Sequence, residues 1–179
     1  IPGLYAYEAG QAAVGDLFSY SERMAPQHIV EEAAKQDKSV LEYLETLASQ
    51  IPVEDQHVVV LDWHNGNRSI LSDSHLTGSV FGLTLQTPFE MVHRAYLEST
   101  AFGTKMIMKQ FEDNDIPVHT VYASGGIPKK SQLLVDIYAN VLNKKVVVLE
   151  SSNATALGAA MLGANVGGAY DTLRETVQH

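Results

Sequence analysis

The sequence contains no cysteine, and its 21 acidic residues outnumber its 12 basic ones. The absence of cysteine excludes disulfides and thiolate metal sites, and it is compatible with a reducing, cytoplasmic location. A formal net charge of −9, without a dense run of lysine and arginine, argues against nucleic acid or an anionic membrane as the main partner. No stretch approaches about 18 consecutive apolar residues, so no spanning helix is predicted. The amino-terminal residues also lack the pattern of a signal peptide.

The 179 residues, 45% of them hydrophobic, are enough for one globular domain with a substantial core. The sequence begins Ile1-Pro2-Gly3, without an initiator methionine, and enters in the middle of a pattern. We therefore expect residues 1–179 to be a fragment of a longer protein, and part of an active site to lie outside it.

The spacing of apolar residues predicts an alternation of helices and strands in the second half of the chain, which is typical of the α/β class. Short apolar runs predict strands over 58–61, 79–84, 118–123 and 145–148. Helical spacing predicts helices over 8–23 (from Gly10 or just before it), 28–36, 38–50, 88–113, from the residues after Gly126 to about Asn143, and 155–163. The helix over 88–113 is apolar on nearly all sides and should be central and buried. The last helix is expected to end at Gly167-Gly168, with Asn153 or Ser152 as its cap.

A pair of glycines, Gly125 and Gly126, lies between the strand ending at Ala123 and the helix that follows. Glycine lets the backbone approach a ligand where a Cβ would clash, and a helix amino terminus attracts anions. Lys129 and Lys130 stand near that terminus, where a cation is unfavourable unless an anion offsets it. Turn geometry alone is the competing interpretation of the two glycines.

Three other segments admit both a structural and a functional interpretation. At the expected start of the first helix, Gly10 either allows a ligand to approach the backbone or only begins the helix. The Glu8 carboxylate either interacts favourably with the helix dipole or accepts hydrogen bonds from sugar hydroxyls. The small residues of 155–163 predict close packing of that helix on a sheet, or the floor of a nucleotide cleft. The polar loop Asp62–Arg68 follows a strand end, where α/β sheets place their chemistry. A metal site from Asp62, His64 and Asp73 matches no ligand spacing, so a structural loop is favoured.

Taken together, these segments resemble the carboxy-terminal domain of the FGGY carbohydrate kinases. The resemblance covers nearly the whole chain in the family's order, and it rests on Tyr7–Asp16, Leu61–Ser69, Gly78, Gly82–Thr84, Thr100–Thr104, Gly125–Lys130 and Ala156–Met161. The double glycine and the Ala-Leu-Gly-Ala-Ala run are typical of the wider family. Tyr7–Gln11 and Asp62–Ser69 are similar to the members that phosphorylate L-ribulose.

The resemblance implies a ribonuclease H-like domain of the actin and hexokinase type, with a mixed sheet flanked by helices. Two such domains would close on ATP, Mg²⁺ and the sugar, and transfer the γ-phosphoryl group of ATP to the 5-hydroxyl of L-ribulose in arabinose catabolism. In the family, the catalytic base is an aspartate upstream of the segments seen here, and so is the first phosphate-binding loop. Residues 1–179 would then be the C-terminal domain, without a catalytic residue or metal ligand of its own, and inactive without the N-terminal domain.

The resemblance also assigns site residues by position. Gly125, Gly126 and Lys130 would line the adenosine pocket, and Gly10 with Val14 would face it from the first helix. Glu8 would contact a sugar hydroxyl. The implied partners are L-ribulose, ATP and the N-terminal kinase domain, and a homo-oligomer is compatible with this assignment.

Three alternatives remain open from the residues alone. Another FGGY kinase, acting on xylulose or glycerol, would share the glycine pair. A non-catalytic actin-like module would bind ATP without transferring phosphate, and a structural domain would bind neither ligand.

Overall fold

The computed structural model describes residues 5–151 and 153–178. Most of the regular structure is helical: α1 (Gly15–Arg23), α2 (Gln27–Lys35), α3 (Val40–Ala48), α4 (Phe89–Glu112), α5 (Ile127–Lys130), α6 (Gln132–Leu142), α7 (Ala154–Val166) and α8 (Leu173–Thr176), with a short 3-10 helix η1 at Val53–Asp55. The strands are β1 (Val59–Leu61), β2 (Ser79–Phe81), β3 (Thr120–Ala123) and β4 (Lys145–Val148). Each predicted element has a counterpart here, and the largest differences in extent concern α1 and the α5–α6 region.

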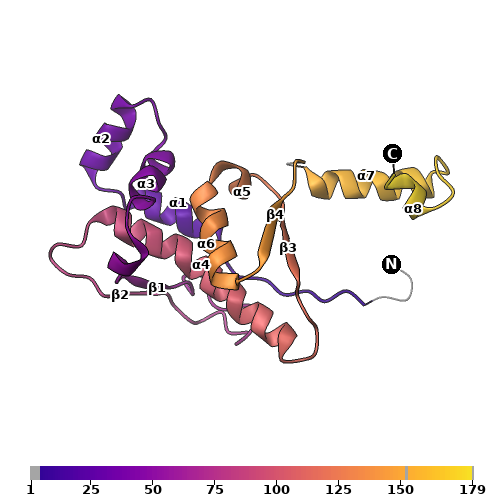
Figure 1. Ribbon diagram of the computed structural model, residues 1–179, viewed down its shortest axis with the longest axis horizontal. Coiled ribbons are helices and arrows are strands. Elements are labelled where there is room, and N and C mark those ends of the chain that lie inside the picture. Colours follow the sequence, from indigo (N-terminus) through magenta and orange to yellow (C-terminus); the bar gives the residue numbers. More distant parts are fainter. Residues whose placement is uncertain (1–4, 152, 179) are drawn as a thin grey trace.

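Helix α4 is the longest element and forms the centre of the fold, in contact with α1, α3, α6 and β1 (Figure 1). Its amino-terminal half is buried on most sides, as the distribution of apolar residues predicts. Farther along the same helix, Phe102 and Met106 are about half exposed. The core therefore surrounds the first half of α4, where Leu17 and Phe18 of α1 and Leu134 and Ile137 of α6 pack against it.

The strands form two separate pairs, and the described residues do not form the single mixed sheet that was expected. β1 and β2 are antiparallel, with Val60 opposite Val80, whereas β3 and β4 are parallel, with Val121 opposite Val146. The pairs remain apart because β1 packs on α4 while β4 packs on α6. The α/β class is confirmed in the coarser sense of a mixed fold in which helices dominate.

The first helix begins at Gly15 and not at Gly10, which corrects the sequence-based boundary. Residues 5–13 belong to no helix or strand, and Val14 occupies the position before the first turn of α1. Gly10 is therefore not a helix-entry glycine, and Glu8 has no helix dipole beside it. The apolar spacing of this segment misled the prediction because its backbone is held by contacts with a distant loop, described below.

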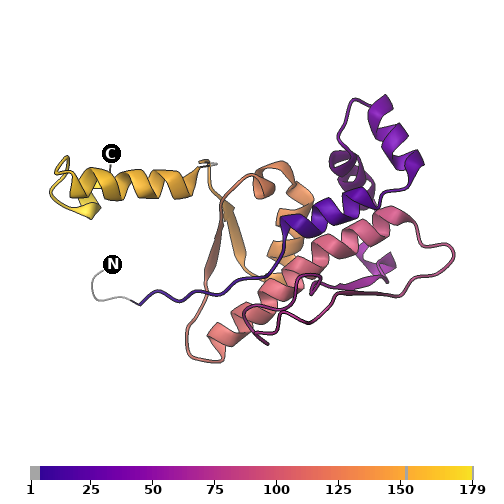
Figure 2. The same cartoon turned by 180° about the vertical axis from the view of Figure 1, so that it is seen from behind.

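The small-residue helix α7 does not pack on a sheet, contrary to expectation. In both views it extends away from the body of the molecule together with α8, on which it packs (Figures 1 and 2). None of its residues is buried, and a Cβ added at Gly158 or Gly163 would meet nothing within 4 Å. The helix continues beyond the end of β4 and does not fold back across the narrow β3–β4 pair, so its small residues stay uncovered.

The ends of α7 agree in part with the sequence analysis. The helix ends at Val166 with Gly167 as its C-cap, as predicted. Asn153 occupies the N-cap position, but its side chain makes no capping hydrogen bond there. The alternative cap, Ser152, lies outside the described residues.

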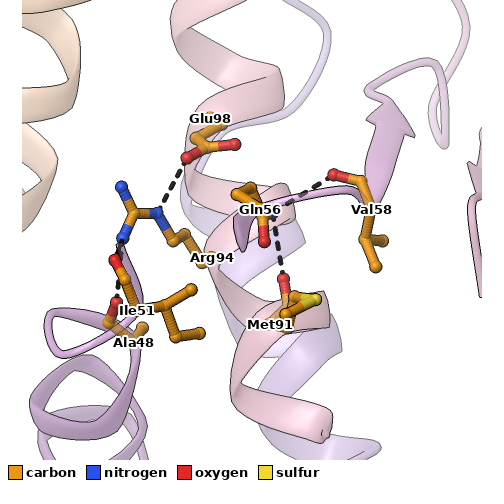
Figure 3. Close-up of polar contacts among 7 residues, drawn as sticks. All are labelled: Ala48, Ile51, Gln56, Val58, Met91, Arg94 and Glu98. Carbon is orange, nitrogen blue, oxygen red and sulfur yellow. Dashed lines mark hydrogen bonds and ion pairs between the residues drawn. The ribbon is translucent and has the colours of Figure 1, made fainter. Parts of the chain in front are cut away.

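A buried arginine joins α4 to the end of α3. Arg94 is 5% exposed, and its Nε donates to Glu98 Oε1 at 2.8 Å. Its Nη1 donates to the carbonyl oxygens of Ala48, at 3.2 Å, and Ile51 (Figure 3). The last carbonyl groups of a helix lack hydrogen-bond partners within the helix. Arg94 provides a donor to these groups at the carboxyl end of α3 and to the chain that follows it.

None of the helices built from the described residues is long and apolar enough to cross a membrane.

We expect Arg94→Met to lower the free energy of unfolding by about 3–5 kcal/mol, because it leaves the partly buried Glu98 carboxylate and the carbonyls of Ala48 and Ile51 without their partner. Urea denaturation measures this change. Arg174→Met, at an exposed position in α8, is the matched control and should stay near wild type. Arg94→Met combined with Glu98→Leu should recover part of the loss, and equal stability of Arg94→Met and wild type would contradict the role of this contact.

Candidate functional site

The glycine turn lies where β3 ends, as the sequence predicts, but the helix after it is interrupted. Gly125 has φ +100°, a conformation that favours glycine, whereas Gly126 has φ −78° and precedes α5. Helix α5 is a single turn and stops at Ser131, whose Oγ accepts from the backbone N–H of Leu134 and caps α6. The predicted continuous helix to Asn143 is therefore two helices. One turn supplies only a small dipole, so the turn must rely on its shape to bind a ligand.

Two hollows meet at this turn. The first, about 350 Å³, is mainly apolar and lies between Val14, the glycines Gly125 and Gly126, strand β3 and helix α6. We call it the glycine hollow. The second, about 480 Å³, lies on the other side of Gly126 between α1, α3 and α5, and Lys130 lines it. We call it the lysine hollow. Four of the five residues assigned to the adenosine pocket thus lie around two adjoining hollows that share Gly126.

The fifth residue, Gly10, lies elsewhere. It lines a third hollow of about 340 Å³, the loop hollow, together with Trp63, Arg68 and Gly103. A Cβ at Gly10 would lie 3.6 Å from the Arg68 guanidinium. The structure therefore does not place Gly10 with Gly125 and Gly126. Gly15, which the sequence reasoning passed over, lines the lysine hollow in its place.

The two lysines of the turn differ in their surroundings. Lys129 donates through Nζ to the backbone carbonyl of Glu150, so its charge already has an acceptor. Lys130 lines the lysine hollow together with Glu42 and Glu45 of α3. Burial raises the pKa of Glu45, and a hydrogen bond with Ser131 opposes this effect. The hollow therefore offers one cation, two carboxylates and apolar walls.

A buried histidine of α4, His93, is among the residues that line the lysine hollow. His93 is fully buried, and its Nδ1 lies 2.6 Å from Ser21 Oγ of α1. Its Nε2 is without a hydrogen-bond partner among the described residues. Burial lowers the pKa of His93 to about 4, so the ring is neutral near neutral pH.

The segment around Glu8 is held by the loop that follows β1. Arg68 Nη2 donates to Glu8 Oε1 at 3.0 Å, and both side chains remain largely exposed. Ser69 Oγ accepts from the backbone N–H of Gly10. Gln11 bonds at once to Asp62 and to two residues of α4, a role that the sequence analysis missed. The Tyr7–Gln11 and Asp62–Ser69 strings, noted separately in the sequence, are thus one structural unit.

The residues considered as metal ligands have other roles in this loop. Asp62 Oδ2 accepts from Gln11 Nε2, and Asp73 Oδ1 accepts from the backbone N–H of His75. His64 packs between Tyr20 and Tyr96, with its Nε2 3.3 Å from the Tyr96 hydroxyl. Over residues 5–151 and 153–178, no three His, Asp or Glu side chains gather in a way that could hold a metal ion.

Residues 1–166 match the C-terminal domain of the FGGY family of carbohydrate kinases. The chain belongs to the FGGY family. It is 78% identical over all 179 residues to Ribulokinase 1 of Staphylococcus saprophyticus, and 57% identical over 178 residues to a ribulokinase of Staphylococcus aureus. The chain spans about a third of these proteins, 33% and 32% of their lengths.

Solved structures of the FGGY family show the same fold. A xylulose kinase from Rhodospirillum rubrum superposes with a TM-score of 0.72 at 26% identity, over 93% of this chain and 32% of that one. A glycerol kinase from Plasmodium falciparum with ADP superposes with a TM-score of 0.68 over 90% of this chain and 30% of that one. At 20% identity, the second comparison shows the fold alone.

The buried His93 predicts a loss of stability in acid. Between pH 6.5 and about 4, the unfolded chain binds a proton that the folded chain excludes, so stability falls as the pH falls, by up to about 1.4 kcal/mol per pH unit. His93→Asn retains a group able to bond Ser21 and lacks this titration. Urea denaturation at pH about 7 and about 5 should show wild type losing more stability than His93→Asn.

His75→Asn, at an exposed histidine, is the control. It should lose as much unfolding free energy between the two pH values as wild type, because it keeps the buried His93. If His93→Asn and wild type lost the same free energy over this range, His93 would not titrate as a buried group.

Proposed function

We propose that this chain is the C-terminal domain of a two-domain kinase that transfers the γ-phosphoryl group of ATP to the 5-hydroxyl of L-ribulose. The observation that carries the proposal is the 78% identity to Ribulokinase 1 over the whole chain. The finer fold assignment, a ribonuclease H-like domain with a mixed sheet, belongs to the same proposal. A kinase of arabinose catabolism would act in the cytoplasm, where ATP is available.

The hollows at the glycine turn support an adenosine site on this domain. The glycine hollow is apolar enough to accept an aromatic base or the face of a ribose, and the lysine hollow adds a cation and hydrogen-bond acceptors. Val14, Gly125, Gly126 and Lys130 are the residues that we assign to it. Gly10 keeps a place in the proposal only on the sugar side, next to Glu8.

In this proposal the chain positions the reactants and does not itself move the proton. The sugar hydroxyl oxygen forms a bond to the γ-phosphorus, the bond from that phosphorus to the ADP oxygen breaks, and a carboxylate of the N-terminal domain takes the hydroxyl proton. The Glu8 carboxylate can accept a hydrogen bond from a sugar hydroxyl because it is largely exposed and only one of its oxygens is engaged by Arg68. Catalysis of this kind depends mainly on orientation and charge stabilisation.

Mg²⁺ would enter with the phosphates of ATP. Such ions are commonly held by one or two carboxylates together with the substrate phosphates, and they neutralise charge during the transfer. Because the described part of this chain offers no cluster of ligands, we assign the protein ligands of the ion to the N-terminal domain.

Turnover by the full-length enzyme tests the proposal. ATP-dependent phosphorylation of L-ribulose should exceed that of D-ribulose, xylulose and glycerol. A preference for xylulose or glycerol would agree with the family assignment and contradict the assignment of L-ribulose as the substrate. ATP binding without transfer to any of the sugars would indicate a nucleotide-binding module.

We expect Gly126→Val to raise the KM for ATP at least about tenfold, because its side chain fills the space shared by the two hollows. The fold should tolerate it, since Gly126 has a negative φ and a Cβ there would meet nothing within 4 Å. Steady-state kinetics of the full-length enzyme measure the change. Ala34→Val, at an exposed position of α2, is the control, and an unchanged KM for ATP in Gly126→Val would overturn the pocket assignment.

A further inference from the structure

We infer that Gln11 is a positioning residue for sugar binding. Its side-chain amide holds residues 5–13, the segment that includes Glu8, against Asp62 and helix α4. This inference rests on the proposed function, because it concerns the affinity for the ketopentose. It assigns a role to two conspicuous strings, Tyr7–Gln11 and Asp62–Ser69, by joining them through one side chain.

Gln11 uses both ends of its amide. Nε2 donates to Asp62 Oδ2 at 2.8 Å and to the backbone carbonyl of Thr100 at 2.9 Å. Oε1 accepts from Thr104 Oγ1 at 2.9 Å. The three contacts fix the orientation of the amide, because exchanging its oxygen and nitrogen would set the oxygen against two acceptors.

Gly103 leaves the space that this arrangement needs. A Cβ at Gly103 would overlap Gln11 Nε2 and would lie 2.6 Å from Asp62 Oδ2, closer than any van der Waals contact. Gly103 is a helical residue of α4, so its backbone conformation does not require glycine. The absence of its side chain allows Gln11 and Asp62 to meet against α4.

Asp62 needs the hydrogen bond because it is partly withdrawn from water. Burial raises the pKa of its carboxyl group, and the Gln11 amide opposes that shift by donating to the ionised form. A second carboxylate in place of the amide would therefore be strongly unfavourable here.

The position of Glu8 depends on this fastening. Residues 5–13 have no helix or strand to hold them, so side-chain contacts determine where Glu8 lies. The other contacts are the exposed Arg68–Glu8 pair, the hydrogen bond from the backbone N–H of Gly10 to Ser69 Oγ, and Asn65 Nδ2, which donates to the carbonyl of Ala12 at 3.2 Å. Exposed ion pairs are weak, so the half-buried Gln11 contacts provide the firmer anchor.

The test uses the full-length enzyme with four variants: Glu8→Ala, Gln11→Glu, Asp62→Asn, and the double variant of the last two. Glu8→Ala should raise the KM for L-ribulose and sets the size of the full effect. Gln11→Glu should raise that KM about tenfold, because it removes the donor to Thr100 and opposes two carboxylates. The KM for ATP should stay near wild type, whereas the melting temperature should fall, because the second carboxylate is unfavourable in the folded protein. Asp62→Asn alone should be mild, since its amide oxygen can still accept from Gln11.

The double variant separates positioning from general damage. It exchanges the amide and the carboxylate between the two positions, so a donor and an acceptor meet again there and part of the loss in KM should be recovered, although the Thr100 carbonyl stays without its donor. Gln110→Glu, the same change at an exposed position of α4, is the matched control and should match wild type.

Three results would overturn the inference: an unchanged KM for L-ribulose in Gln11→Glu, a parallel rise in the KM for ATP, or no rescue by Asp62→Asn. A wild-type enzyme that phosphorylates a different sugar would instead overturn the proposed function, and the same variants would then be tested on that sugar.

Discussion

The arrangement of the molecule depends on the buried guanidinium of Arg94. One side chain neutralises Glu98 within α4 and provides donors to the carbonyls of Ala48 and Ile51 at the end of α3. Gln56 continues this connection, because its Nε2 donates to the carbonyls of Val58 and Met91 and so joins the start of β1 to α4. Helices α3 and α4 and strand β1 are thereby set in a fixed relation, on which the walls of the lysine hollow and the base of the Asp62–Ser69 loop both depend.

The two halves of the candidate site differ in what defines them: open space at the glycine turn, and side-chain contacts around Glu8. The proposed adenosine side is defined by space: Gly125 adopts a left-handed turn, and Gly126 lines both hollows. The proposed sugar side depends on side-chain contacts, since the irregular segment 5–13 is held by hydrogen bonds and an ion pair with residues far away in the sequence. Both sides include the chain that leads into α1, through Val14 and Gly15 on one side and Gln11 on the other.

Local patterns predicted the elements well and their tertiary partners poorly. The strands and the central helix α4 follow from apolar spacing, and the glycine turn lies where the sequence places it. The predicted start of α1 was wrong because Gln11 forms hydrogen bonds with Asp62 and Thr100. Contacts between residues so far apart in the sequence leave no periodic pattern of apolar residues. The small residues of α7 predicted close packing but carried no information about its partner. The family resemblance assigned Gly10 to the nucleotide side, and no local pattern showed that Gly10 would lie beside Arg68, because that contact is decided by tertiary structure.

The only tryptophan of the chain, Trp63, lies between Asp62 and His64 and lines the loop hollow. Its indole therefore belongs to the same loop that holds Glu8 and Gln11. The tryptophan fluorescence of this domain thus has a single source, and its emission reports the polarity around that loop. This optical signal is in this way confined to the loop hollow, while the glycine turn, which holds no tryptophan, contributes nothing to it.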